Sequence, residues 1–286
     1  MPIDEPRHLA QLTARVRNRA KATGRDENRL ARLIANVVVG QMLPDGIIKG
    51  GTALKVRVGD AQTRFSRDLD AARAAGTDLD AYLDELDDNL RQGWHGFTGT
   101  VRPGREAKAP PSVPAEYVMK PFKIGLSYRG SAWLTIDLEI GHDEVGSTIE
   151  PDVVISPDVV ELFETLGLPA PAPIPMLPIP HQIAQKLHAC TWVGDGSGNA
   201  RAHDLVDLQV IVAEERPDLA AAGEVAVRLF ASRRAQSWKP VVVAYPNDDP
   251  TLDWATLYAE AAEGLDVLPT VEEAVRWANE ELIARM

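Results

Sequence analysis

The chain has 286 residues, of which 45% are hydrophobic and 25% charged, and this balance excludes wholesale disorder. The single cysteine, Cys190, excludes an internal disulfide or a zinc site made of cysteines, and no apolar run reaches the roughly 18 residues of a membrane helix. The formal net charge of −12 argues against a general nucleic-acid coat, but it is compatible with a local basic surface.

Two helices open the predicted fold. The first covers residues 6–22, and the second follows Gly24-Arg25-Asp26, with apolar residues at helical spacing up to Val38. Eight basic residues lie between positions 7 and 32, against two acids: Arg7, Arg15, Arg17, Arg19, Lys21, Arg25, Arg29 and Arg32. Two interpretations stay open for them, namely solvated helix faces and a docking surface for a polyanion.

A short strand at residues 46–49 ends at Gly50-Gly51, and a short helix is predicted over residues 52–58, just after the glycines. The chain then returns as an extended segment over residues 63–70. An acidic amphipathic helix follows at residues 77–90.

The middle of the chain predicts antiparallel sheet, with strands at residues 94–101, 117–128 and 133–140 and a loop at 103–114. Six prolines within residues 169–180 predict an extended connector without helix or central strand. Helices are expected beyond it at residues 181–192, 203–213, 219–231, 252–264 and 271–285. We therefore expect an α+β domain over residues 1–168, the connector at 169–180 and a helical domain over 181–286.

The most informative stretch joins the two glycines to Asp68-Leu69-Asp70. Adjacent glycines between a strand and a helix N-terminus let backbone N–H groups approach phosphate oxygens. Asp68 and Asp70 are two apart on an extended segment, so their carboxylates face the same side and suit Mg²⁺. A third acid, Asp137, lies in another predicted strand, and its convergence with the first two would support in-line nucleotidyl displacement.

In this order, the motifs resemble those of the minimal nucleotidyltransferases of the DNA polymerase β superfamily, and within it the AbiEii family of type IV toxin–antitoxin toxins, which includes the MenT toxins. Three blocks carry the resemblance. They are Gly50-Gly51-Thr52-Ala53-Leu54 with Arg57 downstream, then residues 64–70 (Arg-Phe-Ser-Arg-Asp-Leu-Asp), then a helix with Gln182, Ala184, Lys186 and Leu187 followed by residues 203–208 (His-Asp-Leu-Val-Asp-Leu). The fold implied is a polymerase β-like nucleotidyltransferase domain with a mixed or antiparallel sheet, plus a helical C-terminal domain.

The resemblance also implies roles for individual residues. Gly50, Gly51 and Thr52 would cradle the phosphates of an NTP substrate. Asp68, Asp70 and Asp137 would hold Mg²⁺ or Mn²⁺, so that Asp68 and Asp70 are expected to be catalytic. Lys186 would meet the triphosphate, and Asp207 would orient this lysine or receive a proton.

Five further positions carry weaker expectations. Arg57, Arg64 and Asp204 accompany the matched motifs, and Asp204 lies three positions before Asp207 on the same helix face. Ser66 is expected among the nucleotide-binding residues, and it matches a serine that related toxins can carry phosphorylated when inhibited; a phosphate there would oppose nucleotide binding. His203 stands where the family usually has arginine or lysine, which puts a phosphate contact at that position in doubt.

The function expected from the resemblance is NMP transfer from an NTP to an RNA acceptor, the tRNA 3′ end, which would block aminoacylation and growth. A protein antitoxin, a monomeric state and a cytoplasmic location without membrane association belong to the same expectation; the polar start of the chain also predicts no secretory signal. Two alternatives stay open. The acceptor could be a small molecule, such as an aminoglycoside, or a protein, and the chain could instead be a catalytically silent NTP-sensing protein.

Overall fold

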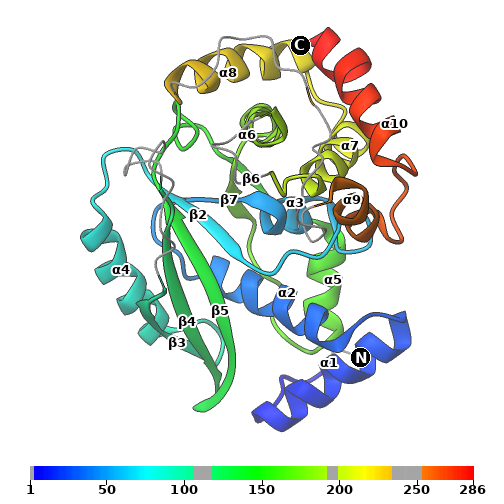
Figure 1. Ribbon diagram of the computed structural model, residues 1–286. Helices are drawn as coiled ribbons and strands as arrows, with labels where there is room; N and C mark the ends of the chain where they lie inside the picture. Colours follow the sequence, from blue (N-terminus) through cyan, green and yellow to red (C-terminus); the bar gives the residue numbers. More distant parts are fainter. Residues whose placement is uncertain (1–2, 106–117, 192–198, 234–241, 243–252) are drawn as a thin grey trace. The chain divides into compact units, whose positions relative to one another are not determined.

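The computed structural model describes residues 3–105, 118–191, 199–233, 242 and 253–286 (Figure 1). The chain forms two compact units. Unit 1 comprises Met1–Asp60, Phe65–Asp143 and Pro151–Met176, and unit 2 comprises Ala61–Arg64, Glu144–Glu150 and Leu177–Met286. Most of the loop predicted at 103–114 lies outside the described residues.

Unit 1 is built on a seven-stranded mixed sheet with the order β3-β4-β5-β2-β1-β7-β6. The strands are β1 (Gly46–Lys49), β2 (Leu69–Arg73), β3 (Phe97–Pro103), β4 (Lys120–Tyr128), β5 (Ser131–Gly141), β6 (Asp152–Val154) and β7 (Ile174–Met176). β3, β4 and β5 pair antiparallel as predicted, whereas β2 pairs with β5 in parallel. The expected α+β fold with a mixed sheet is confirmed.

The proline-rich segment differs from its prediction as a connector without a central strand. β7 lies inside the sheet, parallel to β1 and antiparallel to β6. The strand is only three residues long and its ladder to β1 is the single pair Ile48↔Met176, so Pro175 has no N–H to contribute there and disrupts little. The next helix also begins earlier than predicted, at Ile179, because Pro180 is tolerated in a first helical turn.

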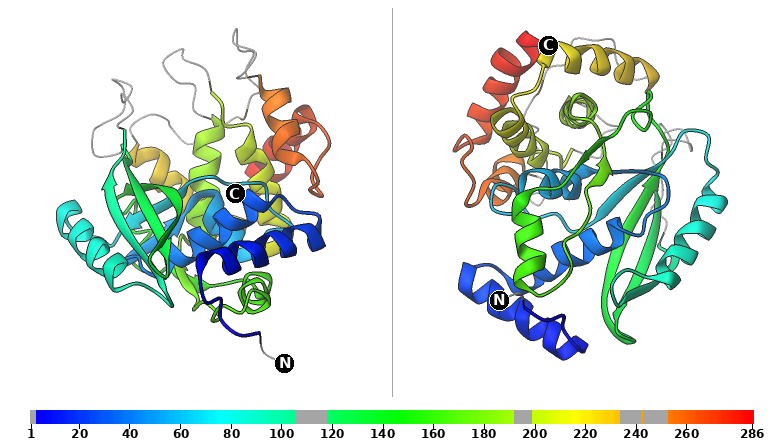
Figure 2. Two further views of the ribbon diagram at one scale, coloured as in Figure 1. Left: turned by 90° about the horizontal axis from the view of Figure 1, so that it is seen from below. Right: turned by 180° about the vertical axis from the view of Figure 1, so that it is seen from behind.

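Five helices belong to unit 1: α1 (Leu9–Thr23), α2 (Glu27–Gly40), α3 (Gly50–Val58), α4 (Leu79–Gln92) and α5 (Pro157–Thr165). Asp26, Asp78 and Ser156 cap α2, α4 and α5 by accepting a backbone N–H with their side chains. α2 carries the most continuous apolar face, and its residues from Leu33 to Val39 are all buried. Figures 1 and 2 show α1 beside α2, and α4 along the β3 side of the sheet.

Unit 2 is helical, with α6 (Ile179–Thr191), α7 (His203–Glu215), α8 (Leu219–Ser232), α9 (Trp254–Ala262) and α10 (Val271–Trp277). α10 continues as a π-helix, η3 (Ala278–Leu282), and a 3₁₀ turn, η4 (Ile283–Arg285). α6 packs against both α7 and α8 (Figure 1). None of the helices in the described part of the chain has the length and apolarity needed to span a bilayer.

Candidate active site

Three of the predicted acids come together through the pairing of β2 with β5. Leu69 lies opposite Leu138 and Asp70 opposite Glu139 in this parallel ladder. Asp68 is the residue before β2, and Asp137 is the residue before Leu138, so the same register places these two side by side. Because side chains alternate along a strand, Asp68, Asp70 and Asp137 all face one side of the sheet.

The segment before Asp68 is not the long extended stretch that we expected over residues 63–70. Residues 64–67 have no regular structure, and β2 begins only at Leu69. Asp68 therefore lies at the end of a strand, where its side chain is exposed, and Asp70 is partly buried. This position leaves the Asp68 carboxylate accessible to a ligand.

The first glycine of the Gly-Gly pair lies directly against Asp70. β1 pairs antiparallel with β2 so that Lys49 is opposite Asp70, and α3 begins at Gly50 rather than after the glycines. Gly50 has φ +70°, and a Cβ at this position would lie 2.0 Å from Oδ2 of Asp70. Only glycine gives the carboxylate this space. The first backbone N–H groups of α3 thus lie beside an acidic side chain, as a phosphate–metal site requires.

The Thr52 hydroxyl connects the Gly-Gly turn to the first acid. Its Oγ1 donates to the backbone carbonyl of Asp68 at 2.7 Å and accepts from Nδ2 of Asn36 at 3.3 Å. Thr52 is 1% exposed. The hydroxyl positions Asp68, because it is buried and already donates its proton. A phosphate contact of Thr52 stays a prediction, and it falls to the backbone N–H of this residue.

Charge around Asp68 is dense. Partial desolvation and the neighbouring Asp137 raise the pKa of Asp68, whereas Arg67, Arg32 and Lys123 act in the opposite direction. Two carboxylates that repel each other in this way favour a bound cation. Lys123 is the cross-strand neighbour of Asp137, and its Nζ donates to Oδ1 at 2.5 Å.

Asp68 and Asp70 fit a divalent cation by their oxygen donors and by the space that Gly50 leaves. Within the described residues, no group of three or more His, Cys, Asp or Glu side chains is arranged to hold a metal ion. Asp137 is held by Lys123 and would have to exchange this partner to become a third ligand.

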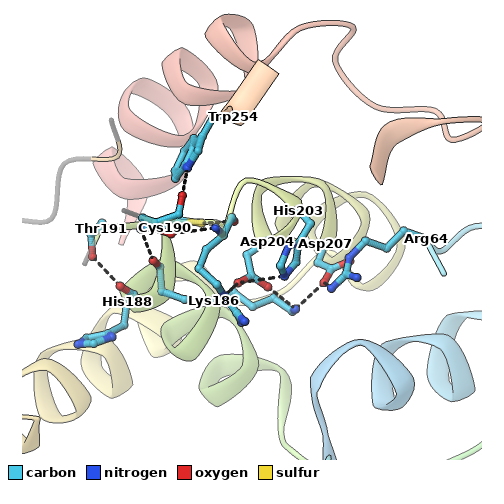
Figure 3. A network of polar contacts seen from close by, with 12 residues as sticks. Arg64, Lys186, His188, Cys190, Thr191, His203, Asp204, Asp207 and Trp254 are labelled. Carbon is cyan, nitrogen blue, oxygen red and sulfur yellow. Dashed lines mark hydrogen bonds and ion pairs between the residues drawn. The ribbon is translucent and has the colours of Figure 1, made fainter. Parts of the chain in front are cut away.

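A second cluster lies within unit 2 (Figure 3). Lys186 on α6 is buried, and its Nζ contacts Oδ1 of Asp204 at 3.0 Å and Oδ2 of Asp207 at 2.6 Å. Arg64 binds both oxygens of Asp207, at 3.0 and 2.9 Å. Arg201 donates to Asp204 at 2.7 Å. The expectation that Asp204 and Asp207 share a helix face is correct, since one ammonium contacts both.

Each charge in this cluster is sustained by its partners. Burial alone would lower the pKa of Lys186, but Asp204 and Asp207 outweigh it and hold the pKa above its ordinary value. Burial would raise the pKa of Asp207, and Lys186 and Arg64 instead hold it below its usual range. Both groups are therefore ionised at neutral pH. Removal of one partner would leave a buried charge uncompensated, which typically costs about 3–5 kcal/mol.

The remaining predicted residues fall in different places. Arg57 forms a partly buried ion pair with Asp152 at 2.6 Å, near the C-terminal end of α3. It is seven residues from Gly50, about 10 Å along a helix, so the structure does not place it with the glycines. Ser66 is partly buried, two residues before Asp68. His203 lies 3.9 Å from Asp204, and burial lowers its pKa to about 4, so it carries no positive charge at neutral pH.

Sequence reasoning did not assign Lys123, Glu139 or Arg201 to these clusters. Lys123 and Glu139 required the register of β4, β5 and β2, which no local pattern gives. Arg201 could have been found, because it lies three residues before Asp204 and such pairs meet on one helical turn.

A family profile decides the identification. The profile described as "Nucleotidyl transferase AbiEii toxin, Type IV TA system" matches residues 30–280. The chain belongs to the AbiEii family. The matched region includes both clusters, so the Gly-Gly turn, the three acids and Lys186 all lie within the AbiEii homology.

The solved structures include a protein with a similar fold. MenT4, the nucleotidyltransferase toxin Rv2826c from Mycobacterium tuberculosis H37Rv, matches with a TM-score of 0.53 and 15% sequence identity. The match covers 96% of this AbiEii-family chain and 97% of the MenT4 chain, so the likeness of fold extends over both. The comparison with curated protein sequences returned no match.

Proposed function

We propose that this member of the AbiEii family transfers an NMP unit from an NTP to the 3′-terminal hydroxyl of an RNA, with a tRNA as the acceptor. The observation that carries the proposal is the β2–β5 register, which brings Asp68 and Asp137 together on the face shared with Asp70. In the reaction, the acceptor oxygen bonds to the α-phosphorus, the bond from this phosphorus to the bridging oxygen breaks, and pyrophosphate leaves. The acceptor hydroxyl releases its proton to solvent water.

Residues of unit 1 carry the binding roles. The backbone N–H groups of Gly50 and Gly51 would bind phosphate oxygens at the start of α3. Asp68 and Asp70 would hold Mg²⁺ or Mn²⁺, with Asp137 as a further ligand once Lys123 moves aside. When bound, such an ion lowers the pKa of the attacking hydroxyl and stabilises negative charge on the phosphates. The carboxylates would supply the negative charge that binds the cation and would fix its position.

The Lys186 cluster is the proposed catalytic part of unit 2. A buried lysine held protonated by Asp204 and Asp207 is a stable positive charge that suits a departing pyrophosphate. Asp207 and Arg64 would orient it through their bidentate pair. In this proposal Asp204 is a positioning residue, because it contacts Lys186 and Arg201.

Further expectations follow from membership of a type IV toxin–antitoxin family. We propose a cytoplasmic, monomeric enzyme that blocks aminoacylation and growth and is restrained by an antitoxin protein. Phosphorylation of Ser66 would add negative charge two residues from Asp68 and oppose both metal and nucleotide binding. Transfer to a small molecule or a protein is the alternative acceptor class, and incubation with labelled NTPs and total RNA, protein or an aminoglycoside separates these acceptors.

The first prediction concerns Asp68→Asn. We expect it to abolish transfer of labelled nucleotide to RNA and to relieve growth arrest, since the amide keeps the shape and removes the charge. The matched control is Asp88→Asn, which removes an acid that is 81% exposed on α4. Labelling of purified tRNA and growth on induction measure both variants. Equal labelling of tRNA by Asp68→Asn and the wild type would overturn the role of Asp68. Growth arrest by both proteins without any labelling would favour a catalytically silent protein.

A further inference from the structure

Six of the eight basic residues at the start of the chain fall into two groups: four contact acids or backbone carbonyls near α1, and two lie beside the segments that carry the acids. Arg17 pairs with Glu27 at 3.1 Å, Arg19 with Glu161 at 3.1 Å, and Arg25 with Asp60 at 3.0 Å. Arg15 donates to the backbone carbonyls of Asp4 and Leu166. These four side chains link α1 and the turn after it to the rest of unit 1, so each guanidinium group already has an acidic or carbonyl partner.

Arg29 and Arg32 behave differently. They lie three residues apart on α2, and neither forms an ion pair with any residue in the described part of the chain. The guanidinium of Arg29 lies 5.0 Å from the centre of the Phe65 ring. Nη1 of Arg32 lies 3.5 Å from the carbonyl oxygen of Thr135 on β5, two residues before Asp137. Both arginines thus point toward the segment and the strand that carry the acids.

A third cation completes this surface. Arg67 is exposed, directly precedes Asp68, and likewise forms no ion pair with a described residue. We define the α2 rim as Arg29, Arg32, Arg67 and the partly buried ring of Phe65. It combines three cations with an aromatic ring, which are the side chains that bind phosphodiesters and stack on unpaired bases. It does so in a protein whose net charge is −12.

The order of the strands indicates whether the α2 rim lies beside the triphosphate of the NTP or beside the phosphodiesters of the acceptor. Gly50 and Gly51 follow β1, on one side of β2, whereas Arg32 contacts β5, on the other side of β2. If the triphosphate lies at the glycines, the rim faces the side from which an acceptor reaches Asp68. The carboxylates of Asp68, Asp137 and Glu139 would repel a phosphodiester there, and the arginines offset this repulsion.

We infer that the α2 rim is the docking surface for the 3′-terminal nucleotides of a single-stranded RNA acceptor. Arg29, Arg32 and Arg67 bind backbone phosphates near the terminal hydroxyl, and the Arg29–Phe65 pair offers a stacking surface to an unpaired base. This inference rests on the proposed RNA nucleotidyltransferase activity and names the surface that selects its acceptor.

The test compares two double variants that remove equal charge. Arg29→Gln with Arg32→Gln changes the rim, whereas Arg17→Gln with Arg19→Gln removes two arginines of α1 that are paired with acids on α2 and α5. Binding of tRNA with periodate-oxidised 3′ ends, which cannot accept a nucleotide, is measured over a series of salt concentrations. Binding of a non-hydrolysable NTP with Mg²⁺ is measured separately, and thermal unfolding checks that each variant is folded.

We expect the rim variant to bind RNA about tenfold more weakly or worse and to lose about two from the slope of log affinity against log salt. The paired-arginine variant should bind RNA like the wild type, and both should bind nucleotide normally. The inference is overturned if the two variants bind RNA equally well, if the rim variant loses nucleotide affinity instead, or if the wild type does not bind RNA.

The proposed activity fails by a different result, namely labelled NTP that the wild type never transfers to RNA. A wild type that labels RNA, together with a rim variant whose RNA affinity is unchanged, refutes the docking surface alone.

Discussion

Gly50 shows how a single side chain, or its absence, decides the geometry of the proposed site. Its φ of +70° is unfavourable for other residues, and the space above its Cα is taken by the carboxylate of Asp70. Gly76 also has a positive φ, +82°, but nothing lies within 4 Å of a Cβ added there. A substitution at either glycine would strain the backbone, but only a substitution at Gly50 would also collide with the acid. Comparing the two positions therefore distinguishes the two effects.

The second prediction is that Gly50→Ala abolishes nucleotidyl transfer, whereas Gly76→Ala leaves it near the wild-type level. Both variants should lose about 1–2 kcal/mol of unfolding free energy from the strained φ. Only Gly50→Ala adds a methyl group in the place of the Asp70 carboxylate. Steady-state labelling of RNA and urea unfolding measure the two effects. Similar activity in both variants would show that the Asp70 contact is irrelevant to function.

At the scale of the elements, hydrogen bonds connect α2, α3 and the start of β2. Thr52 on α3 holds the backbone of Asp68 before β2, and Asn36 on α2 supports Thr52. Because Asp68 precedes the strand, its position depends on this hydroxyl as well as on the β-ladder. Thr165 offers a comparable hydroxyl that bonds only within its own helix, to the carbonyl of Leu162 at 2.8 Å.

The third prediction is therefore that Thr52→Val lowers both stability and transfer. Loss of the hydroxyl leaves the Asp68 carbonyl without this donor, which costs about 1–3 kcal/mol when the group is buried. The kcat for RNA labelling should fall more than the KM for the NTP rises, since the misplaced group is Asp68. Thr165→Val should change neither kinetic constant. A Thr52→Val enzyme with wild-type kcat would contradict the positioning role.

The local sequence pattern predicted several helices and strands but missed others. The alternation of apolar and polar residues predicted the strands β4 and β5. Helical spacing of apolar residues predicted the capped amphipathic helices. The three-residue strands β6 and β7 carry too few residues for a periodic signal, and α5 was not anticipated. Arg57 shows a further difficulty, since proximity in sequence to the Gly-Gly pair did not reveal that a helix would carry its side chain to Asp152.

Across unit 2, one buried histidine, His188, and one partly buried histidine, His203, make the stability of the protein sensitive to acid. Nδ1 of His188 accepts a hydrogen bond from Nη1 of Arg233 at 3.1 Å, and the ring packs edge-on against Phe230. Burial, then the charge of Arg233, lowers the pKa of His188 to about 4. Burial likewise lowers the pKa of His203 to about 4. Both rings are neutral in the folded protein at neutral pH.

The fourth prediction concerns pH. An unfolded histidine takes up its proton near pH 6.5, whereas these two in the folded protein do so only near pH 4, so protons favour the unfolded state in between. The free energy of unfolding should fall as pH decreases from about 6.5 to about 4, by at most about 1.4 kcal/mol per pH unit for each histidine. Urea unfolding followed by circular dichroism at several pH values measures this.

His188→Asn is the variant that checks the cause. The amide can still meet Arg233, but it does not titrate, so about half of the histidine contribution to the slope should vanish. Protonation of Asp204 and Asp207 also lowers the free energy of unfolding, but in a different pH range. Because their pKa values are lowered, this loss occurs below pH 4. An unchanged slope in His188→Asn would contradict the assignment.

The amino-acid sequence alone determined the residue types of the proposed chemistry, their order and the family resemblance, because a strand–Gly-Gly–helix turn and an Asp-x-Asp pair are local features. It also determined that Asp204 and Asp207 share a face, since helical spacing is local too. Only the tertiary structure decided that Asp137 neighbours Asp68, that Lys123 holds Asp137, and which arginines are already paired. These depend on strand register and on contacts between residues far apart in the chain, where the energy of packing rather than local spacing selects the partner.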